Sequence, residues 1–193
     1  MQTEAFVLTQ TGTAKTAFQR QEISISAPKG AEVLIEVEAF GLNYADVMAR
    51  LGLYREAPPM PCVLGYELVG KIIEVGENAP PQLLGKRVLA FTRFGAYAKH
   101  AITLADAVLE IPEHMHAAQA LPFATQGVTA YYMTDILAPI QPNDKVLVHA
   151  AAGGVGSFLI QLARLRGATV IASTGSDHKI PYIESLGAQH VIN

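Results

Sequence analysis

The sequence has little of what secreted and membrane-spanning proteins need. Its 193 residues include one cysteine, Cys62, so no disulfide can form within the chain, and a reducing, cytoplasmic location is the simplest expectation. No apolar run approaches the roughly 20 residues that cross a bilayer, and the N-terminal segment lacks the features of a signal peptide. We therefore expect a soluble chain without a membrane partner.

Charge is also scarce and is not clustered. The chain has 14 Lys and Arg against 17 Asp and Glu, which gives a formal net charge of −3. Nucleic-acid and anionic-membrane surfaces need a basic patch, so no nucleic-acid partner is expected. Hydrophobic residues make up 50% of the chain and charged residues 16%, a balance typical of a compact α/β protein.

Short strands separated by turns dominate the first two-thirds of the chain. Strand candidates cover residues 3–8, 32–39, 66–75, 87–92, 96–103 and 107–111. Many short strands of this kind are typical of a closed or partly closed barrel. A short helix is expected from Asn43 to Leu51, with Asn43 as its N-cap and Gly52 as its stop. We assign residues 1–120 to this β-rich domain.

The pattern changes near residue 116. Residues 116–137 favour a helix with a bend near Pro122, and a strand–helix–strand–helix–strand order follows. The expected strands are 145–149, 169–173 and 190–193, and the expected helices end near Arg166 and Leu186. This order is half of a doubly wound parallel sheet, whose full form has about six strands. Residues 121–193 are therefore predicted to be the first half of a Rossmann domain, in a fragment of a longer protein.

A stretch of small residues follows the strand at 145–149. It ends in Ala151-Ala152-Gly153-Gly154-Val155-Gly156, where a helix is expected to begin. Small residues at such a place let a pyrophosphate approach the N–H groups of the helix start. The usual G-x-G-x-x-G has alanine at its first position here. The stretch indicates dinucleotide binding, and the alternative is a tight turn that binds nothing.

The end of the second strand of this half-sheet indicates the type of dinucleotide. An NAD site usually has an acid about 20 residues after the motif begins. That count reaches Ile171 or Ser173, and no acid occurs before Asp177. Lys179 follows closely, and a small polar loop with a cation suits the 2′-phosphate of NADPH. Lys179 as a solvated helix residue is the alternative.

Four motifs stand in order along the chain: Gly41 to Asp46, Arg50 to Tyr54, Gln126 to Tyr132 and His149 to Gly156. Together they make the chain similar to the zinc-free NADPH:quinone oxidoreductase (zeta-crystallin) branch of the medium-chain dehydrogenase/reductase family. The resemblance implies a GroES-like β-barrel domain followed by a Rossmann domain, with the active site in the cleft between them. It also implies a homodimer for the full-length protein.

The resemblance makes the metal question specific. Zinc enzymes of this superfamily have a cysteine where this chain has Asn43, and a histidine where it has Tyr66. An amide and a phenol are poor zinc ligands at neutral pH, and one cysteine cannot build a four-cysteine structural site. No metal is therefore expected. A quinone needs no Lewis acid, because it is already electrophilic and becomes aromatic on reduction.

Site residues carry over from the family at matching positions. The resemblance places Asn43 and Thr129 at the nicotinamide, Gly153, Gly154, Val155 and Gly156 along the pyrophosphate, Ser173 and Lys179 at the adenosine phosphate, and Tyr54 in the substrate cleft. Tyr54 would donate a hydrogen bond to a developing oxyanion, and Tyr54 and Asn43 are the predicted catalytic residues.

Each of these residues also has a plainer interpretation. The alternative interpretation of Tyr54 is a barrel-packing residue, that of Asn43 a helix cap, and that of Thr129 a helix threonine bonded to its own backbone. Glu67 is a candidate for proton transfer or for a structural role. Four further residues are interpreted as structural or surface residues: Cys62, His114, His116 and His149.

The predicted activity is NADPH-dependent transfer of a hydride to a quinone. Reduction of an activated enone or enoyl thioester is the alternative enzyme activity, because both reactions add hydride to an electron-poor conjugated carbonyl. A non-catalytic NADPH-binding protein, of a crystallin-like or regulatory kind, is the alternative from another class.

Overall fold

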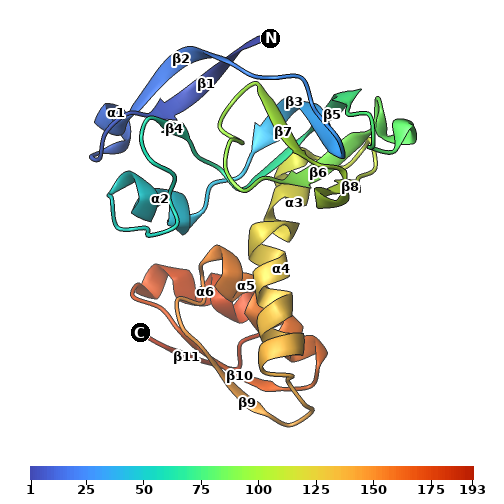
Figure 1. The fold of residues 1–193 in the computed structure, drawn as a ribbon. Coiled ribbons are helices and arrows are strands. Elements are labelled where there is room, and N and C mark those ends of the chain that lie inside the picture. Colours follow the sequence, from blue (N-terminus) through green and yellow to red (C-terminus); the bar gives the residue numbers. More distant parts are fainter. The chain divides into compact units, whose positions relative to one another are not determined.

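The computed structural model describes all residues, Met1 to Asn193, and they form two compact units, Met1–Thr125 and Gln126–Asn193. Unit 1 is β-rich and unit 2 is α/β (Figure 1). The division lies five residues beyond the boundary expected from the sequence. Within unit 2, the longest helix has 12 residues, and no helix in either unit is long and apolar enough to cross a membrane.

Unit 1 contains two antiparallel sheets, with strand orders β2-β1-β4 and β7-β3-β5-β6-β8. The strands are β1 Gln2–Leu8, β2 Phe18–Ser24, β3 Glu32–Phe40, β4 Cys62–Val63, β5 Glu67–Val75, β6 Arg87–Phe91, β7 His100–Leu104 and β8 Val108–Glu110. The helices are α1 Ala14–Ala17, α2 Tyr44–Arg50 and α3 Ala117–Ala120, with 3-10 turns at Pro81–Leu83, Ala105–Ala107 and Leu121–Phe123.

The segment before β7 joins the two sheets. Lys99 donates its N–H to Glu4 of β1, and its carbonyl accepts the N–H of Val37 of β3, at 2.8 and 2.9 Å. Phe6 donates to the carbonyl of Tyr97 at 2.8 Å. One strand was expected over 96–103, but only 100–104 pairs as a strand, because residues 96–99 cross between the sheets. The result is the partly closed barrel that the sequence predicted.

Unit 2 has a three-stranded parallel sheet of order β11-β10-β9. Its elements are α4 Thr125–Tyr131, whose first residue belongs to unit 1, a π-helix Tyr132–Leu137, β9 Lys145–Val148, α5 Gly154–Leu165, β10 Thr169–Ser173, a 3-10 helix Asp177–Lys179, α6 Ile180–Ser185 and β11 His190–Ile192. The strand order places the first strand at one edge, as in half of a Rossmann sheet.

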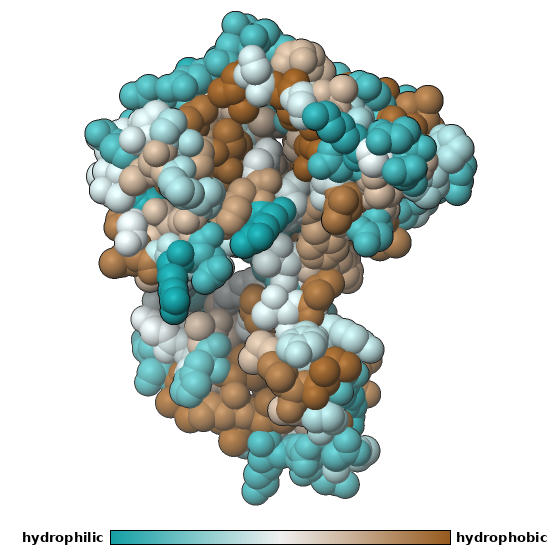
Figure 2. Space-filling model, in the orientation of Figure 1, coloured by the Kyte–Doolittle hydropathy of each residue, from teal (hydrophilic) through white to brown (hydrophobic).

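One face of this sheet is covered and the other is not. Val148, Val170 and Ala172 pack with Ile160 of α5 and Ile183 of α6 in a fully buried core. On the alternate positions, Leu147 is 52% exposed and Ile192 is 55% exposed. Hydrophobic residues accordingly gather on the lower part of the surface in Figure 2, where this sheet lies. The sheet is therefore a partial one, as expected for an incomplete Rossmann domain.

Candidate functional site

A small cavity opens at the carboxyl ends of β9 and β10 in unit 2. Its volume is about 250 Å³. The lining residues are Ala150, Ala152, Gly153, Thr174, Gly175 and Lys179. Five of the six have short side chains, so the main chain forms most of the wall. Lys179 is the one charged group in the lining.

The turn after β9 creates this cavity. Ala150 has a φ of +49°, a left-handed conformation uncommon for a residue with a side chain. The next residue, Ala151, donates its N–H to the carbonyl of Ser173 at 3.0 Å, which ties the turn to the end of β10. Helix α5 then begins at Gly154 with Gly153 as its N-cap. The helix thus begins within the small-residue stretch, and Gly154, Val155 and Gly156 lie in its first turn.

The glycines of this segment are required for different reasons. A Cβ on Gly156 would lie 2.6 Å from the carbonyl oxygen of Ala150, so Gly156 lets α5 pack closely on the turn. A Cβ on Gly154 would lie 2.3 Å from Oε1 of Gln126, the residue at the start of α4. A Cβ on Gly153 would meet only the Ala150 carbonyl, at 3.1 Å. Among Gly153, Gly154 and Gly156, Gly153 therefore has the most open space beside its Cα atom.

Of the two residues predicted at the adenosine phosphate, Lys179 lines the cavity and Ser173 does not. The hydroxyl of Ser173 is hydrogen-bonded to Nδ1 of His149 at 2.9 Å, and its neighbour Thr174 lines the cavity instead. Lys179 is exposed at the end of its 3-10 helix and lines the cavity. Asp177, the acid nearest to Lys179 in the sequence, accepts a hydrogen bond from the Asn193 side chain at 2.6 Å. Thr174 was missed by sequence reasoning, although it directly follows Ser173 at the strand end.

In unit 1, a buried polar cluster surrounds Asn43. Nδ2 of Asn43 donates to both carboxylate oxygens of Glu67, at 2.8 and 2.9 Å, and the hydroxyl of Thr125 donates to the same carboxylate. Burial raises the pKa of the Glu67 carboxyl, and the hydrogen bonds from Thr125 and Asn43 oppose this shift. Asn43 is also the N-cap of α2, as expected.

A second buried carboxylate, Asp46, holds the start of α2. It accepts the backbone N–H of Asn43 at 3.0 Å and that of Gly65 at 3.2 Å, and it is hydrogen-bonded to the Tyr97 hydroxyl. Burial raises the pKa of Asp46, again against its hydrogen bonds. Gly65 has a φ of +100°, and a Cβ there would lie 2.5 Å from the Tyr97 ring. Only glycine fits this close approach.

Tyr54 is half-buried and packs in the core around Leu64 and Tyr97. It is also hydrogen-bonded to the hydroxyl of Tyr66. Burial and this hydrogen bond raise the pKa of Tyr66, whose ring lies 5.0 Å from that of Phe94 between centroids. The packing interpretation of Tyr54 is therefore consistent with its contacts, and its role toward a substrate oxygen stays a prediction.

Four other candidates from the sequence are Thr129, His114, His116 and Cys62. Thr129 is exposed on α4. Nδ1 of His116 accepts the N–H of Ala118 at 3.2 Å and so caps α3. Burial raises the pKa of the half-buried Cys62 thiol. No group of three or more His, Cys, Asp or Glu side chains is arranged to hold a metal ion.

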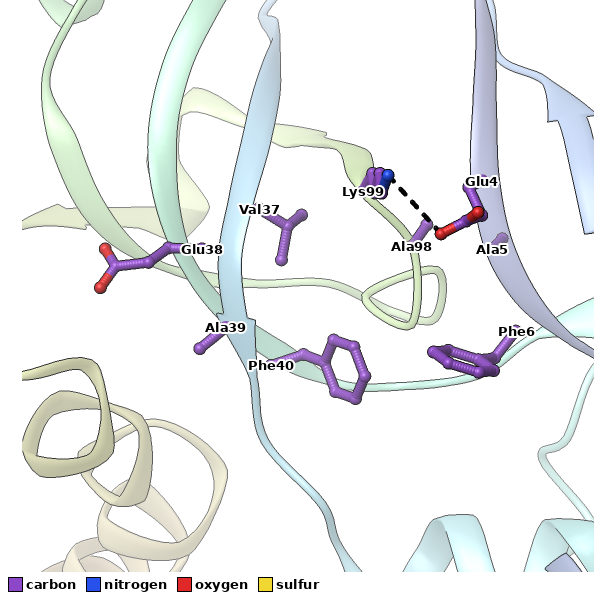
Figure 3. Close-up of a pocket in the computed structure, with 9 residues that line it drawn as sticks. All are labelled: Glu4, Ala5, Phe6, Val37, Glu38, Ala39, Phe40, Ala98 and Lys99. Carbon is purple, nitrogen blue, oxygen red and sulfur yellow. Dashed lines mark ion pairs between the residues drawn. The ribbon is translucent and has the colours of Figure 1, made fainter. Parts of the chain in front are cut away.

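A further cavity of about 350 Å³ lies in unit 1 between β1, β3 and the crossing segment. Figure 3 shows Phe6 and Phe40 turned toward the space between their strands, with the Lys99–Glu4 ion pair at its other end. The two rings meet edge to face with centroids 6.5 Å apart. None of the predicted site residues lines this cavity, which marks the open seam between the two sheets.

Two family profiles match the chain. The family described as "Alcohol dehydrogenase GroES-like domain" matches residues 29–113, and "Zinc-binding dehydrogenase" matches residues 154–193. The human synaptic vesicle membrane protein VAT-1 homolog is 34% identical over 94% of this chain and 46% of its own length. Human quinone oxidoreductase is 33% identical over 90% of this chain and 53% of its own length.

Solved structures agree with these sequence matches. The Escherichia coli quinone oxidoreductase complexed with NADPH has a TM-score of 0.90 and 32% identity, and the match covers 98% of this chain and 58% of that one. The CurK enoyl reductase also has a TM-score of 0.90 and 32% identity, covering 99% of this chain and 59% of that one.

The two profiles and these relatives show that the chain belongs to the medium-chain dehydrogenase/reductase family, among relatives that include quinone oxidoreductases. The chain spans about half the length of the two human relatives.

Proposed function

We propose that this chain binds NADPH, and that the protein to which it belongs reduces a quinone with it, without zinc. The main support is the cavity beside Gly153 and Lys179, where the main chain is accessible and the only charge is positive. When bound, NADPH supplies the hydride, and a preformed site supplies position and hydrogen bonds.

The residues of unit 2 fit a phosphorylated dinucleotide. The N–H groups of Gly154, Val155 and Gly156 in the first turn of α5 have no acceptor within the helix, so these three residues are proposed to line the pyrophosphate. Gly153 is proposed to line it through the open space beside its Cα, because its own N–H donates to the Ala150 carbonyl at 2.8 Å. Ser173 and Lys179 are proposed to hold the 2′-phosphate, and Thr174 joins them because it lines the cavity. An acid that would repel this phosphate is absent from the lining, and Asp177 is bonded to Asn193.

In unit 1, Asn43 and Tyr54 are proposed as the catalytic residues, with Thr129 of unit 2 as a further nicotinamide contact. Tyr66 keeps its proton, because burial and the hydrogen bond with Tyr54 raise its pKa. The Tyr54 hydroxyl is therefore held by a neutral partner and is available to donate toward a substrate oxygen. An Asn43 amide bonded to Glu67 and a phenol at Tyr66 are not zinc ligands.

A second activity, reduction of an activated enone or enoyl thioester, has specific support. The CurK enoyl reductase matches this chain as well as the E. coli quinone oxidoreductase does, with the same TM-score of 0.90 and the same identity of 32%. Both substrates are conjugated carbonyl compounds, so the same hydride donor and the same hydroxyl donor serve either reaction.

Cofactor titration followed by turnover tests the proposal. NADPH fluorescence should report saturable binding to the chain, with NADH binding at least about tenfold more weakly, since it lacks the phosphate that Lys179 recognises. NADPH oxidation on addition of 1,4-benzoquinone or crotonyl-CoA, measured on the full-length protein, separates the two activities. Tight binding without turnover of either acceptor would favour a non-catalytic role, and equal affinity for both cofactors would argue against the phosphate site.

Homodimerisation of the full-length protein and a cytoplasmic location stay predictions of the sequence. Analytical ultracentrifugation of the full-length protein would test the first, and imaging of a tagged protein would test the second.

A further inference from the structure

Glu67 is a buried residue with a carboxylate group, and it has no role in the hydride transfer proposed above. It is 1% exposed, although it carries an ionisable group. Residue 41 has to be a glycine beside it, because a Cβ there would lie 1.9 Å from Oε1 of Glu67. Burying a carboxylate costs free energy unless hydrogen bonds compensate it. The hydrogen bonds of Glu67 therefore have to offset the cost of its burial.

Those contacts come from the beginnings of two helices. Asn43, the N-cap of α2, donates Nδ2 to both oxygens of Glu67, at 2.8 and 2.9 Å. Thr125, the first residue of α4, donates both its hydroxyl and its backbone N–H to the same carboxylate. A negative charge at a helix N-terminus is favourable, because the first N–H groups lack partners and the helix dipole is positive there.

The same two helices carry the two residues proposed to contact the nicotinamide. Asn43 is held directly, so that the orientation of its amide is set by Glu67. Thr129 lies one turn after Thr125 on α4, so that the carboxylate anchors the turn from which Thr129 projects. Glu67 itself is closed to a substrate, because its two oxygens face the donors of Asn43 and Thr125.

We propose that Glu67 is a positioning residue for the nicotinamide end of the cofactor, acting through Asn43 and through the start of α4, and not a proton donor. The inference rests on the proposed function, since it concerns how the NADPH site is held. Glu67→Gln tests it, because a glutamine offers one acceptor oxygen and an NH₂ group that would face the donors now satisfied by the carboxylate.

Two ligands test the nicotinamide end and the adenosine end of the proposed site independently. NADPH reaches the nicotinamide end, whereas 2′,5′-ADP carries only the adenosine and its phosphates. In Glu67→Gln, we expect the Kd for NADPH to rise about tenfold, the effect of losing one hydrogen bond to a charged group. The Kd for 2′,5′-ADP should change less than about twofold, within the scatter expected for an untouched contact. Amide hydrogen exchange should rise over residues 44–50 and 125–131 in the ligand-free chain.

Two further variants distinguish a specific effect on NADPH binding from a general destabilisation of the fold. Thr125→Val removes only the hydroxyl contact, and it should raise exchange over 125–131 and weaken NADPH but not 2′,5′-ADP. Thr3→Val is the matched control, because Thr3 is also buried in unit 1 and its hydroxyl bonds Nδ1 of His100 at 2.9 Å. It should leave both ligands unaffected.

The outcomes are distinct. If the unmodified chain binds both ligands and Glu67→Gln binds NADPH equally well, the positioning role is wrong while the proposed function stands. Equal weakening of NADPH and 2′,5′-ADP would also overturn it. If the unmodified chain binds neither ligand, both the proposed function and the role of Glu67 toward the cofactor are wrong.

Discussion

At the scale of single residues, buried carboxylates organise the polar part of unit 1. Asp46 is 5% exposed and Glu67 1% exposed, and each accepts hydrogen bonds from a different group of Asn43. Neither acid belongs to a metal-binding group. Asn43 is thus the N-cap of α2, and Glu67 fixes the orientation of its side-chain amide. Its interpretation as a helix cap is therefore compatible with the proposed contact with the nicotinamide.

The raised pKa of Glu67 predicts a pH dependence of stability. The pKa of Glu67 has its ordinary value of 4.5 in the unfolded chain and is raised in the folded chain. At a pH between these two pKa values, the unfolded chain has lost the proton that the folded chain keeps. The contribution of Glu67 to the free energy of unfolding is therefore present at low pH and falls as the pH rises through this window. Glu67→Gln lacks this contribution.

The difference in unfolding free energy between the unmodified chain and Glu67→Gln should therefore shrink as the pH rises. Urea denaturation at a series of pH values measures it. A difference that grows with pH would mean that the hydrogen bonds from Asn43 and Thr125 outweigh burial, and that the pKa is lowered instead.

Lys179 provides a prediction about cofactor choice. Lys179→Ala should weaken NADPH by about 1.5 to 3 kcal/mol, the range for a hydrogen bond to a charged group, and should leave NADH almost unchanged. Isothermal titration with each cofactor measures both effects. Lys145→Ala is the matched control, because Lys145 is an exposed lysine at the opposite end of β9. Equal losses for NADPH and NADH would refute the assignment.

At the scale of elements, the turn between β9 and α5 depends on backbone packing. Alanine normally favours a helix over glycine by about 1 kcal/mol, but a Cβ on Gly156 would lie 2.6 Å from one main-chain atom and 2.8 Å from another. Gly156→Ala should therefore destabilise unit 2 by about 1 to 3 kcal/mol, the usual cost of overpacking. Chemical denaturation measures the change.

Gly175→Ala is the control for that substitution, because a Cβ on Gly175 would meet nothing within 4 Å. Its unfolding free energy should stay within about 0.5 kcal/mol of the unmodified chain, as for other surface changes. Comparable losses for the two variants would mean that the turn does not depend on close packing at Gly156.

Elements with strong local signals were predicted well, and the others were not. The strand at 169–173 was predicted with both ends correct, because a short run rich in apolar and β-branched residues lies between Gly167 and Gly175. The strand β2, Phe18–Ser24, was missed. Its apolar Phe18 and Ile23 are separated by Gln19, Arg20, Gln21 and Glu22, so it is held by seven paired positions with β1 and not by its own pattern.

At the scale of the whole molecule, unit 2 has the first three strands of a doubly wound sheet with helices on one face only. Exposed side chains such as Leu147 line the other face and the edge of β9. The relatives named above are about twice as long as this chain. Turnover is therefore best measured on the full-length protein, whereas binding at the cavity in unit 2 can be measured on the chain itself.

The metal prediction also belongs to this scale. Purified protein should contain well under about one zinc ion per ten chains, because a stable catalytic site needs three protein ligands and Asn43 and Tyr66 are poor ones. Elemental analysis by mass spectrometry measures the content, and added zinc should leave the thermal midpoint unchanged. A stoichiometric zinc ion, or a clear rise in the midpoint, would contradict the zinc-free assignment.

Local patterns along the chain were sufficient for the fold class, the family, the dinucleotide motif and the N-cap at Asn43, because each depends on residues close together in sequence. Such patterns did not predict the contacts of Glu67 with Asn43 and Thr125, the hydrogen bond between Tyr54 and Tyr66, or the place of Thr174 in the cavity wall. These features join residues that are distant in sequence or depend on which way one side chain turns, and only long-range packing sets these.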